Sequence, residues 1–299
     1  MITILWVMTV ASIVSLAGAL AGRQSVNATR NRVQAERALW MALGCARRTQ
    51  AEIDDALREP KSLDEVGLVW RMLERRVVSP PPSRTQPCEV RLEAAGTMLD
   101  VNAATEEMVA SLLRGLGQGD ETAAAMAAAL ADWQDADDTD RPGGAERGWY
   151  HAAVRPLPRN APLPDVKELA LVRGFDSLPG VEDVFTAEPG RISLAHASAS
   201  VLLSVPGFTR ETAELIASLA EAGTPVRDAS AIVGRVSQQS AEAIASHYPE
   251  IVRVTTADPD AWLLDVRVAN GEPPTAVRLR WRVIRSGRRC VVVNSRTML

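Results

Sequence analysis

The chain has 299 residues, of which 46% are apolar and 23% are charged, which is enough for about two packed domains. Its 33 basic and 37 acidic residues give a net charge of −4, which excludes a polycation that binds nucleic acid through overall charge. Three cysteines permit at most one disulfide bond, so the chain is not a disulfide-stabilised scaffold.

The first 22 residues carry no charged side chain. As a helix they would span roughly 30 Å, the thickness of the hydrocarbon core of a membrane. The segment lacks the basic start of a cleaved secretory signal, and its apolar run is too long for one. Residues 1–22 are therefore predicted to form a transmembrane helix, with a signal peptide and a buried core helix as the alternatives.

The segment that follows predicts a continuation of the same helix. Residues 23–59 contain no proline, their apolar side chains recur near the helical period, and Pro60 follows them. The whole helix would be on the order of 90 Å long. Such a helix is either a simple tether or an assembly element whose first part lies in lipid or in a filament core. The arginines that follow the apolar run would be cytoplasmic under the positive-inside rule.

Strands are predicted at two places in the chain. After a loop around Pro80, residues 88–92 and 98–101 are short strands, and the last fifty residues contain four more at 251–254, 262–268, 276–284 and 289–293. Asn270-Gly271 and Ser286-Gly287 are the expected turns.

Two details of these strands have functional alternatives. Arginines at 278, 280 and 282 alternate with apolar residues, so they form either a solvated sheet face or a binding stripe. Cys88 and Cys290 both lie in predicted strands and could pair if those strands were neighbours.

A motif in the central region occurs twice. Residues 99–105 and 192–198 each precede an apolar helical pattern, and a Glu-Thr-Ala sequence opens a second helix after each. The expected caps are Thr105 and Ser198 at the helix starts, and Gly115 and Gly207 with positive φ at the helix ends. The pattern predicts two helix-hairpin-helix units, followed by a weaker helix pair over residues 229–246.

Helix-hairpin-helix units often bind the nucleic-acid backbone through amides at the hairpin. Here acidic residues follow both hairpins, and no basic stripe accompanies them. Phosphate binding would lack its electrostatic driving force, so we expect a structural role and no nucleic-acid partner.

An acidic loop lies between the two units. Residues 132–146 hold six carboxylates and a single arginine. Counted from residue 135, oxygen-bearing side chains fall at positions one, three, five and twelve, as in a calcium loop, although position six is not glycine and no second helix follows. We predict a calcium site unlike an EF-hand, with a solvated acidic loop as the alternative. Its predicted ligands are Asp135, Asp137, Asp138, Asp140 and Glu146.

No enzyme motif is found in the sequence. His151, His196 and His247 lack metal-ligand spacing, and there is neither a glycine-rich phosphate loop nor a GxSxG sequence. We therefore predict no catalytic residue and no enzymatic activity.

Several of these segments together resemble one known family. They are the apolar ITILWVM, the VNAAT helix start, the LADWQDADD segment with the following RPGGAE and WY, the stretch LPDVKELALVR and the second Pro-Gly hairpin. In this order they resemble the minor pseudopilin K family of type II secretion systems, also called general secretion pathway protein K, over nearly the whole chain.

The resemblance implies an α+β fold. A long N-terminal membrane and pilin-like helix would pack on a small antiparallel sheet, with a large inserted α-helical domain that holds the two helix-hairpin-helix (SAM-like) units. The implied parts are a transmembrane segment 1–22, a continuing helix 23–59, a first α/β part 60–98, an inserted domain 99–250 divided at 190/191, and a C-terminal β part 251–299.

The resemblance also implies a function. The chain would be a non-enzymatic minor pseudopilin, anchored in the inner membrane by a single span, with its soluble domain in the periplasm. With minor pseudopilins of the I and J types it would form the tip of the pseudopilus and support protein export across the outer membrane. A membrane-tethered helix-hairpin-helix protein that binds DNA during uptake is the alternative.

Two family features bear on processing and on metal. Pseudopilins carry a short basic leader that prepilin peptidase removes, so this peptidase is an expected partner if a leader precedes Met1. The family's inserted domain binds calcium, in agreement with the loop. Its further acidic residues are replaced here by Arg147 and Gly148, so a second calcium ion is not predicted.

Overall fold

The computed structural model describes residues 2–58, 63–74, 88–270 and 275–298. The chain divides into two compact units, one formed by Met1–Glu93 with Leu263–Leu299 and the other by Ala94–Trp262. The loop expected around Pro80, the glycine of the Asn270-Gly271 turn and Pro60 lie outside the described residues.

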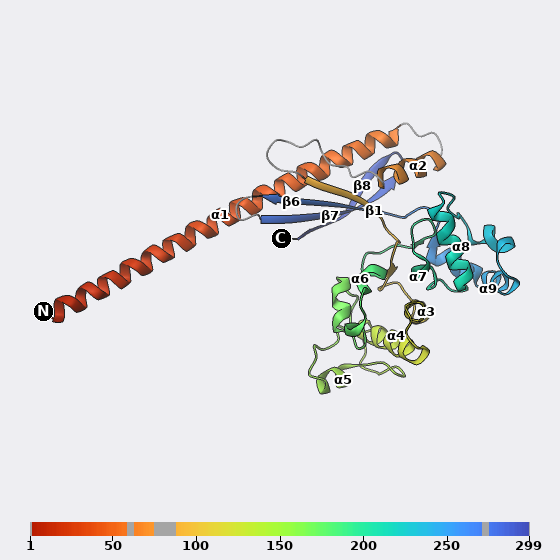
Figure 1. Ribbon diagram of the computed structural model, residues 1–299, viewed down its shortest axis with the longest axis horizontal. Helices are drawn as coiled ribbons and strands as arrows, with labels where there is room; N and C mark the ends of the chain where they lie inside the picture. The colour runs from red at the N-terminus through yellow and green to blue at the C-terminus, as the bar shows by residue number, and fades with distance from the viewer. Residues whose placement is uncertain (1, 59–62, 75–87, 271–274, 299) are drawn as a thin grey trace. The chain divides into compact units, whose positions relative to one another are not determined.

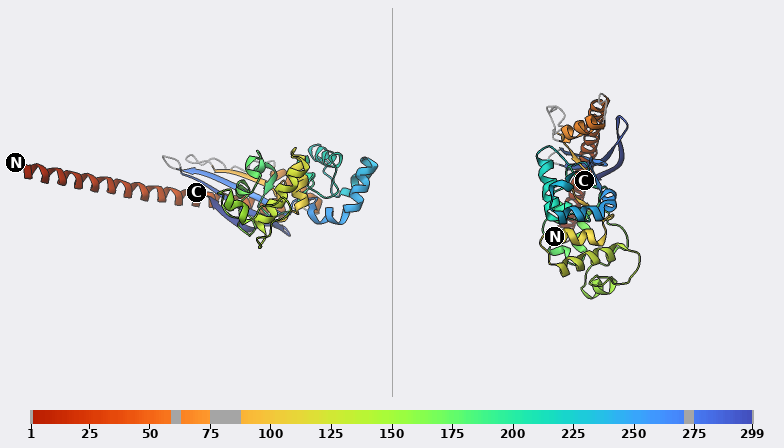
Figure 2. Two further views of the ribbon diagram at one scale, coloured as in Figure 1. Left: turned by 90° about the horizontal axis from the view of Figure 1, so that it is seen from below. Right: turned by 90° about the vertical axis from the view of Figure 1, so that its right-hand side faces the viewer.

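The first unit begins with one continuous helix, α1 (Ile2–Arg58), which confirms the helix predicted over residues 1–59. Its N-terminal half projects away from the sheet as a single rod (Figure 1, Figure 2). Apolar side chains on this half are exposed, Trp6 to 71%, and the helix is long and apolar enough to cross a membrane. Further along, small and apolar residues at helical spacing are buried, and this part of α1 packs on the sheet. They are Ala38, Ala42, Ala46, Ile53 and Leu57.

The rest of the first unit is a short helix and a four-stranded sheet. Helix α2 (Leu63–Glu74) packs against α1. The strands are β1 (Cys88–Ala94), β6 (Trp262–Asn270), β7 (Thr275–Ser286) and β8 (Arg289–Met298), in the order β1-β6-β7-β8 with β7 and β8 antiparallel. The strands predicted at 88–92, 262–268, 276–284 and 289–293 are confirmed.

The arginine row on β7 borders a buried carboxylate that the sequence pattern did not indicate. Asp265 on β6 is 1% exposed as a side chain, and Arg278 Nε donates to its Oδ2 at 2.6 Å. Arg280 Nη2 donates to the same oxygen at 3.2 Å. Two arginines of the row therefore neutralise an internal charge.

The disulfide bond of the first unit joins Cys45 on α1 to Cys88 on β1, with 6.7 Å between their Cα atoms. The condition set for a bond between Cys88 and Cys290, that their strands are neighbours, is not met. β1 and β8 are opposite edges of the sheet, about 14 Å apart at the usual strand spacing, which is too far for a disulfide. Cys290 is a buried free thiol, and burial with the nearby charge of Asp54 raises its pKa to about 12.

The second unit is mainly helical. Its helices are α3 (Glu106–Gly115), α4 (Asp120–Gln134), α5 (Arg147–Ala152), α6 (Val181–Val184), α7 (Ala199–Leu202), α8 (Arg210–Glu221) and α9 (Gln238–Val254), with 3-10 helices η1 (Val166–Leu171), η2 (Phe175–Ser177) and η3 (Ala229–Arg235). Two parallel bridges join β2 (Leu99–Asp100) to β3 (Phe185–Thr186) and β4 (Ile192–Ser193) to β5 (Thr255–Thr256). α3 packs on α4, α7 on α8, and α9 on η3. Their classification as helix-hairpin-helix units stays a prediction.

The predicted strand at 251–254 is wrong, because these residues complete α9. Ile244 and Ile251 are both buried and lie seven residues apart, on one face of the helix. The strand that follows is β5, which begins at Thr255.

The predicted helix caps are largely confirmed. Thr105 and Ser198 each accept a bond at 3.3 Å from the amide three residues on, and Gly207 has φ +78°. Gly115 does not have the predicted positive φ, which belongs to Gly117, where the amide of the next residue bonds back to the last turn of α3. Gly115 instead permits close packing, since a Cβ there would lie 2.9 Å from Leu203 Cδ1.

Candidate metal centre

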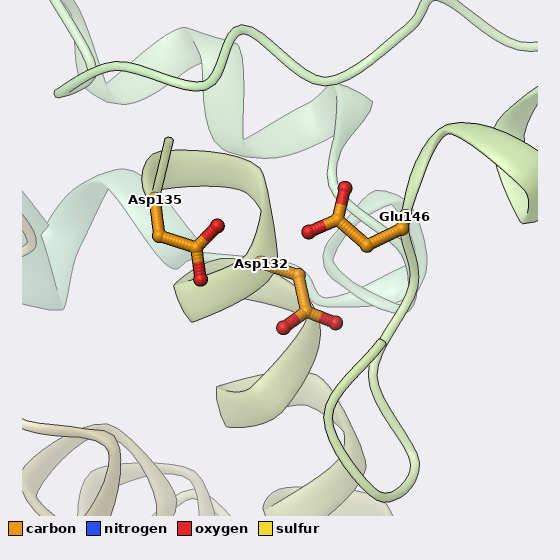
Figure 3. A group of neighbouring side chains, drawn as sticks. All are labelled: Asp132, Asp135 and Glu146. Atoms are coloured by element: carbon orange, nitrogen blue, oxygen red, sulfur yellow. The ribbon is translucent and has the colours of Figure 1, made fainter. Parts of the chain in front are cut away.

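Three carboxylates converge where α4 ends and α5 begins (Figure 3). Asp132 lies in the last turn of α4, Asp135 is its C-cap, and Glu146 is the N-cap residue of α5. One oxygen of each lies within 4.8 Å of the others. Oxygens on opposite sides of one calcium ion are about 5 Å apart, so this spacing suits three ligands of a single ion.

Asp132 is fully buried, and the loop that follows α4 wraps around its carboxylate. Its Oδ2 accepts from the amides of Ala145 at 2.8 Å and Arg141 at 3.3 Å. Gly144 makes this wrap possible, because a Cβ at that position would lie 2.0 Å from Asp132 Oδ2. A glycine and a buried aspartate thus fix the position of the loop.

One cation of the chain lies within the cluster. Arg141 Nη1 donates to Asp132 Oδ1 at 2.7 Å and also to Asp135 Oδ2. Hydrogen bonds to Asp135 and Asp132 raise the pKa of the Arg141 guanidinium further above its usual value. Two of the three carboxylates are therefore paired with arginine.

Glu146 is the carboxylate without a partner. It is 2% exposed, and among the described residues neither of its oxygens accepts a hydrogen bond. Burial, with the negative charges of Asp132 and Asp135, raises the pKa of Glu146 to about 7. A buried carboxylate that points at two others is the arrangement that a cation would stabilise.

A layer of aromatic and basic residues supports the loop from the other side. Trp133 Nε1 donates to Glu168 at 3.0 Å, and the Trp133 ring meets Tyr150 edge-on with 5.1 Å between centroids. Arg173 Nη1 donates to the carbonyl of Gly144 at 2.9 Å, and the Tyr150 hydroxyl accepts from the Arg173 amide. These contacts hold the loop backbone in place against the end of α4.

Of the five ligands predicted from the sequence, the structure brings Asp135 and Glu146 together. Asp137, Asp138 and Asp140 are exposed on the loop outside the three-carboxylate cluster. Asp137 Oδ1 accepts from the Thr139 amide at 2.8 Å, and Asp140 Oδ1 accepts from the Glu146 amide at 2.9 Å. The charge of Asp138 is close enough to contribute to the raised pKa of Glu146.

Asp132 is the cluster residue that the sequence reasoning left out of the ligand set. The calcium-loop spacing begins at residue 135, so it does not include Asp132. A different signal was available, because residues three apart in a helix lie on the same face, which places Asp132 beside Asp135.

Comparison with known proteins covers the segment that holds this cluster. Residues 90–178 match the model of the family described as type II secretion system (T2SS), protein K. Over these residues the chain is similar to the protein K family. The resemblance that the sequence indicated is thereby confirmed, and the matched range runs from β1 through η2 and includes the acidic loop.

One solved structure extends the likeness in fold beyond that range. A chain of the crystal structure of the GspK-GspI-GspJ complex from the enterotoxigenic Escherichia coli type 2 secretion system is 16% identical, with a TM-score of 0.63. The match covers 91% of this chain and 99% of that one, so the two share a fold over nearly their full lengths. No curated protein matches the chain.

The chemistry of the cluster is that of a hard cation site. All three groups are carboxylates, and oxygen ligands suit calcium or magnesium rather than zinc or copper. Calcium needs six to eight oxygen ligands, and the three carboxylates supply only three if each binds through one oxygen. Bidentate binding, loop carbonyls, water or the neighbouring exposed aspartates would have to supply the remainder.

Proposed function

We propose that this chain is a non-enzymatic minor pseudopilin of a type II secretion system. With minor pseudopilins of the I and J types it would form the tip of the periplasmic pseudopilus and support protein export across the outer membrane. The observation that carries the proposal is the protein K match over residues 90–178. The fold shared with a chain of the GspK-GspI-GspJ complex supports the choice of partners.

We further propose an inner-membrane anchor and a periplasmic head. The exposed apolar side chains of the first part of α1 suit lipid, or the equivalent helices of partner subunits. The disulfide bond between Cys45 and Cys88 supports a periplasmic location, because disulfides persist in the bacterial periplasm and are rare in the cytosol. The arginines after the apolar run would favour the opposite orientation, with this side of the membrane helix in the cytoplasm.

The acidic loop is proposed to hold one structural calcium ion. Asp132, Asp135 and Glu146 would bind it, and Asp137, Asp138 and Asp140 remain candidate ligands from the sequence pattern. The ion would supply positive charge to a cluster in which one buried carboxylate has no hydrogen-bond partner among the described residues. In this role the residues order the loop between α4 and α5 and take part in no reaction.

The function is tested by complementation and complex formation. In a strain that lacks this chain, we expect its secreted proteins to be retained in the periplasm, and expression of the chain to restore export. The full chain in detergent should co-elute with the I and J type minor pseudopilins. Unimpaired export without the chain would refute the proposal. A DNA gel shift by the purified chain at physiological salt would favour the DNA-uptake alternative.

The calcium site is tested with the full chain in detergent after treatment with EGTA. We expect heat on titration with calcium chloride and a rise in the melting temperature. Asp132→Asn should abolish both, whereas Glu182→Gln, an exposed carboxylate outside the loop, should leave both unchanged. The absence of heat and of a melting shift in the unmodified chain would remove the site.

A further inference from the structure

We propose that Arg141 is a tethered cation that competes with calcium for the same position, and so sets the affinity of the site. The inference rests on the proposed calcium site. In the ion-free chain the guanidinium lies between Asp132 and Asp135, and it has to leave before a metal ion can bind both. The loop would thus exchange one cation for another.

One nitrogen atom of Arg141 lies where a metal ion would have to bind. Arg141 Nη1 contacts Asp132 Oδ1 at 2.7 Å and also contacts Asp135 Oδ2. A calcium ion lies 2.3–2.6 Å from its carboxylate oxygens, so an ion bound to the same two oxygens would occupy the space of this nitrogen. The guanidinium and the ion therefore exclude each other.

The other oxygens of the two aspartates do not offer a way around this conflict. Asp132 Oδ2 accepts from the amides of Arg141 and Ala145 and holds the loop in place. Asp135 Oδ1 accepts from the Asp137 amide at 3.4 Å. Arg141 contacts the other oxygen of each aspartate, which these loop amides leave unused, so those two oxygens are the ones that a metal ion would take.

The guanidinium of Arg141 has an alternative partner nearby, the carboxylate of Glu106. The Arg141 side chain is 37% exposed, and its Nε lies 3.8 Å from Glu106 Oε2 in the first turn of α3. The Glu106 side chain is itself 49% exposed. A rotation of the long arginine side chain toward Glu106 would keep it paired after it leaves the aspartates.

Arg141 and a divalent metal ion differ in the number of carboxylates that each can bind. Arg141 pairs with Asp132 and Asp135 but leaves both oxygens of Glu146 without a hydrogen bond. A divalent ion can bind all three carboxylates at once, which the single positive charge of Arg141 does not achieve. Arg141 thus stabilises the loop without a metal ion, and the metal ion stabilises the loop when it is bound.

The size of the competition follows from occupancy. A guanidinium that holds the position in about nine molecules of ten lowers the apparent metal affinity about tenfold. Its removal should raise the affinity by that factor. Removal of Glu106, which receives the displaced arginine, should lower the affinity by about two- to threefold, since a partly exposed ion pair is weak.

The test measures calcium affinity by titration calorimetry on the full chain in detergent. We expect Arg141→Met to bind calcium chloride about tenfold more tightly than the unmodified chain, Arg141→Lys to lie between them, and Glu106→Gln to bind more weakly. Arg147→Met removes one exposed positive charge three residues after Gly144 and should change the affinity less than threefold. If Arg141→Met folds poorly without calcium, Arg141→Lys and Glu106→Gln carry the test.

The outcomes separate this inference from the calcium site itself. Calcium binding by the unmodified chain with an equal or weaker affinity in Arg141→Met would overturn the competition alone. An equal gain in Arg147→Met would also overturn it, because net charge would then explain the effect. No calcium binding by any variant would overturn the calcium site, and the competition with it.

Discussion

Glu146→Gln provides a quantitative test of the charge balance in the acidic loop. The raised pKa of Glu146, about 7 against an ordinary 4.5, means that the folded chain holds a proton more tightly at this carboxyl than the unfolded chain does. Stability is therefore greatest while Glu146 is protonated, falls as pH rises from about 4.5, and reaches its lower level above about 7. Each tenfold difference in proton affinity is worth 1.36 kcal/mol, so the loss is on the order of 3 kcal/mol at pH 8. Glutamine keeps the shape of the side chain and cannot ionise.

The assay is thermal and urea unfolding of the ion-free full chain in detergent, with EGTA, between pH 4.5 and 8. We expect Glu146→Gln to exceed the unmodified chain in stability by about 3 kcal/mol at pH 8 and to match it at pH 4.5. Calcium should reverse the order at pH 8, because it stabilises only the chain with the carboxylate. Glu182→Gln should follow the unmodified chain at every pH. Equal stabilities at pH 8, or a gap that persists at pH 4.5, would refute the reasoning.

Three further predictions concern structure rather than binding. Gly144→Ala should cost about 2 kcal/mol or more and abolish calcium binding, because its Cβ would meet a carboxylate oxygen at 2.0 Å, whereas Gly148→Ala meets no atom within 4 Å and should be neutral by thermal unfolding. Cys45→Ser or Cys88→Ser should lower the unfolding free energy by about 2–4 kcal/mol in urea titrations, and dithiothreitol should cause the same loss only in the unmodified chain. At Asp265, burial raises the pKa, but the paired arginines of β7 have the larger effect and lower the pKa overall. Asp265→Asn should therefore lower the free energy of unfolding by about 3 kcal/mol at neutral pH. This difference should disappear in acid, as the pH falls through the lowered pKa.

The long elements of the first unit could be predicted from the sequence because each depends on a local pattern. An uncharged run followed by helical periodicity predicts α1, and strict alternation predicts β7. The prediction of a strand at 251–254 was wrong because these four residues, three of them apolar, are equally compatible with a strand and with the end of a helix. Burial of Ile251 on the face it shares with Ile244 decided for the helix, and that depends on tertiary packing.

The long-range pairs could not be predicted in the same way. Cys88 had two possible partners, and the order of strands in the sheet, which is a property of the whole unit, excluded Cys290. The burial of Asp265 among arginines likewise depends on which strand neighbours β7. Sequence spacing alone contains no information about strand order.

The acidic loop was recognisable from composition, yet its central residues were only partly identified. A calcium-loop count assumes that ligands follow one another along a turn, whereas this cluster takes two residues from the end of a helix and one from the next helix start. The same geometry places an arginine between the aspartates, and no spacing rule predicts the position of such a cation.

The burial pattern of the loop explains why its order should depend on a cation. Residues 136–140 are exposed, and the buried apolar residues within 132–146 are Trp133 and Ala145, so the hydrophobic effect holds this segment only at its two ends. What remains is electrostatic, namely six carboxylates attracted to a single guanidinium or to a metal ion. Arg173 holds the loop at Gly144, but the exposed part before it keeps its backbone position only while one of the two cations is present. Loss of both Arg141 and calcium should therefore unfold residues 136–142 locally, while the apolar core of the second unit, which includes Trp133, Leu112 and Phe185, stays intact.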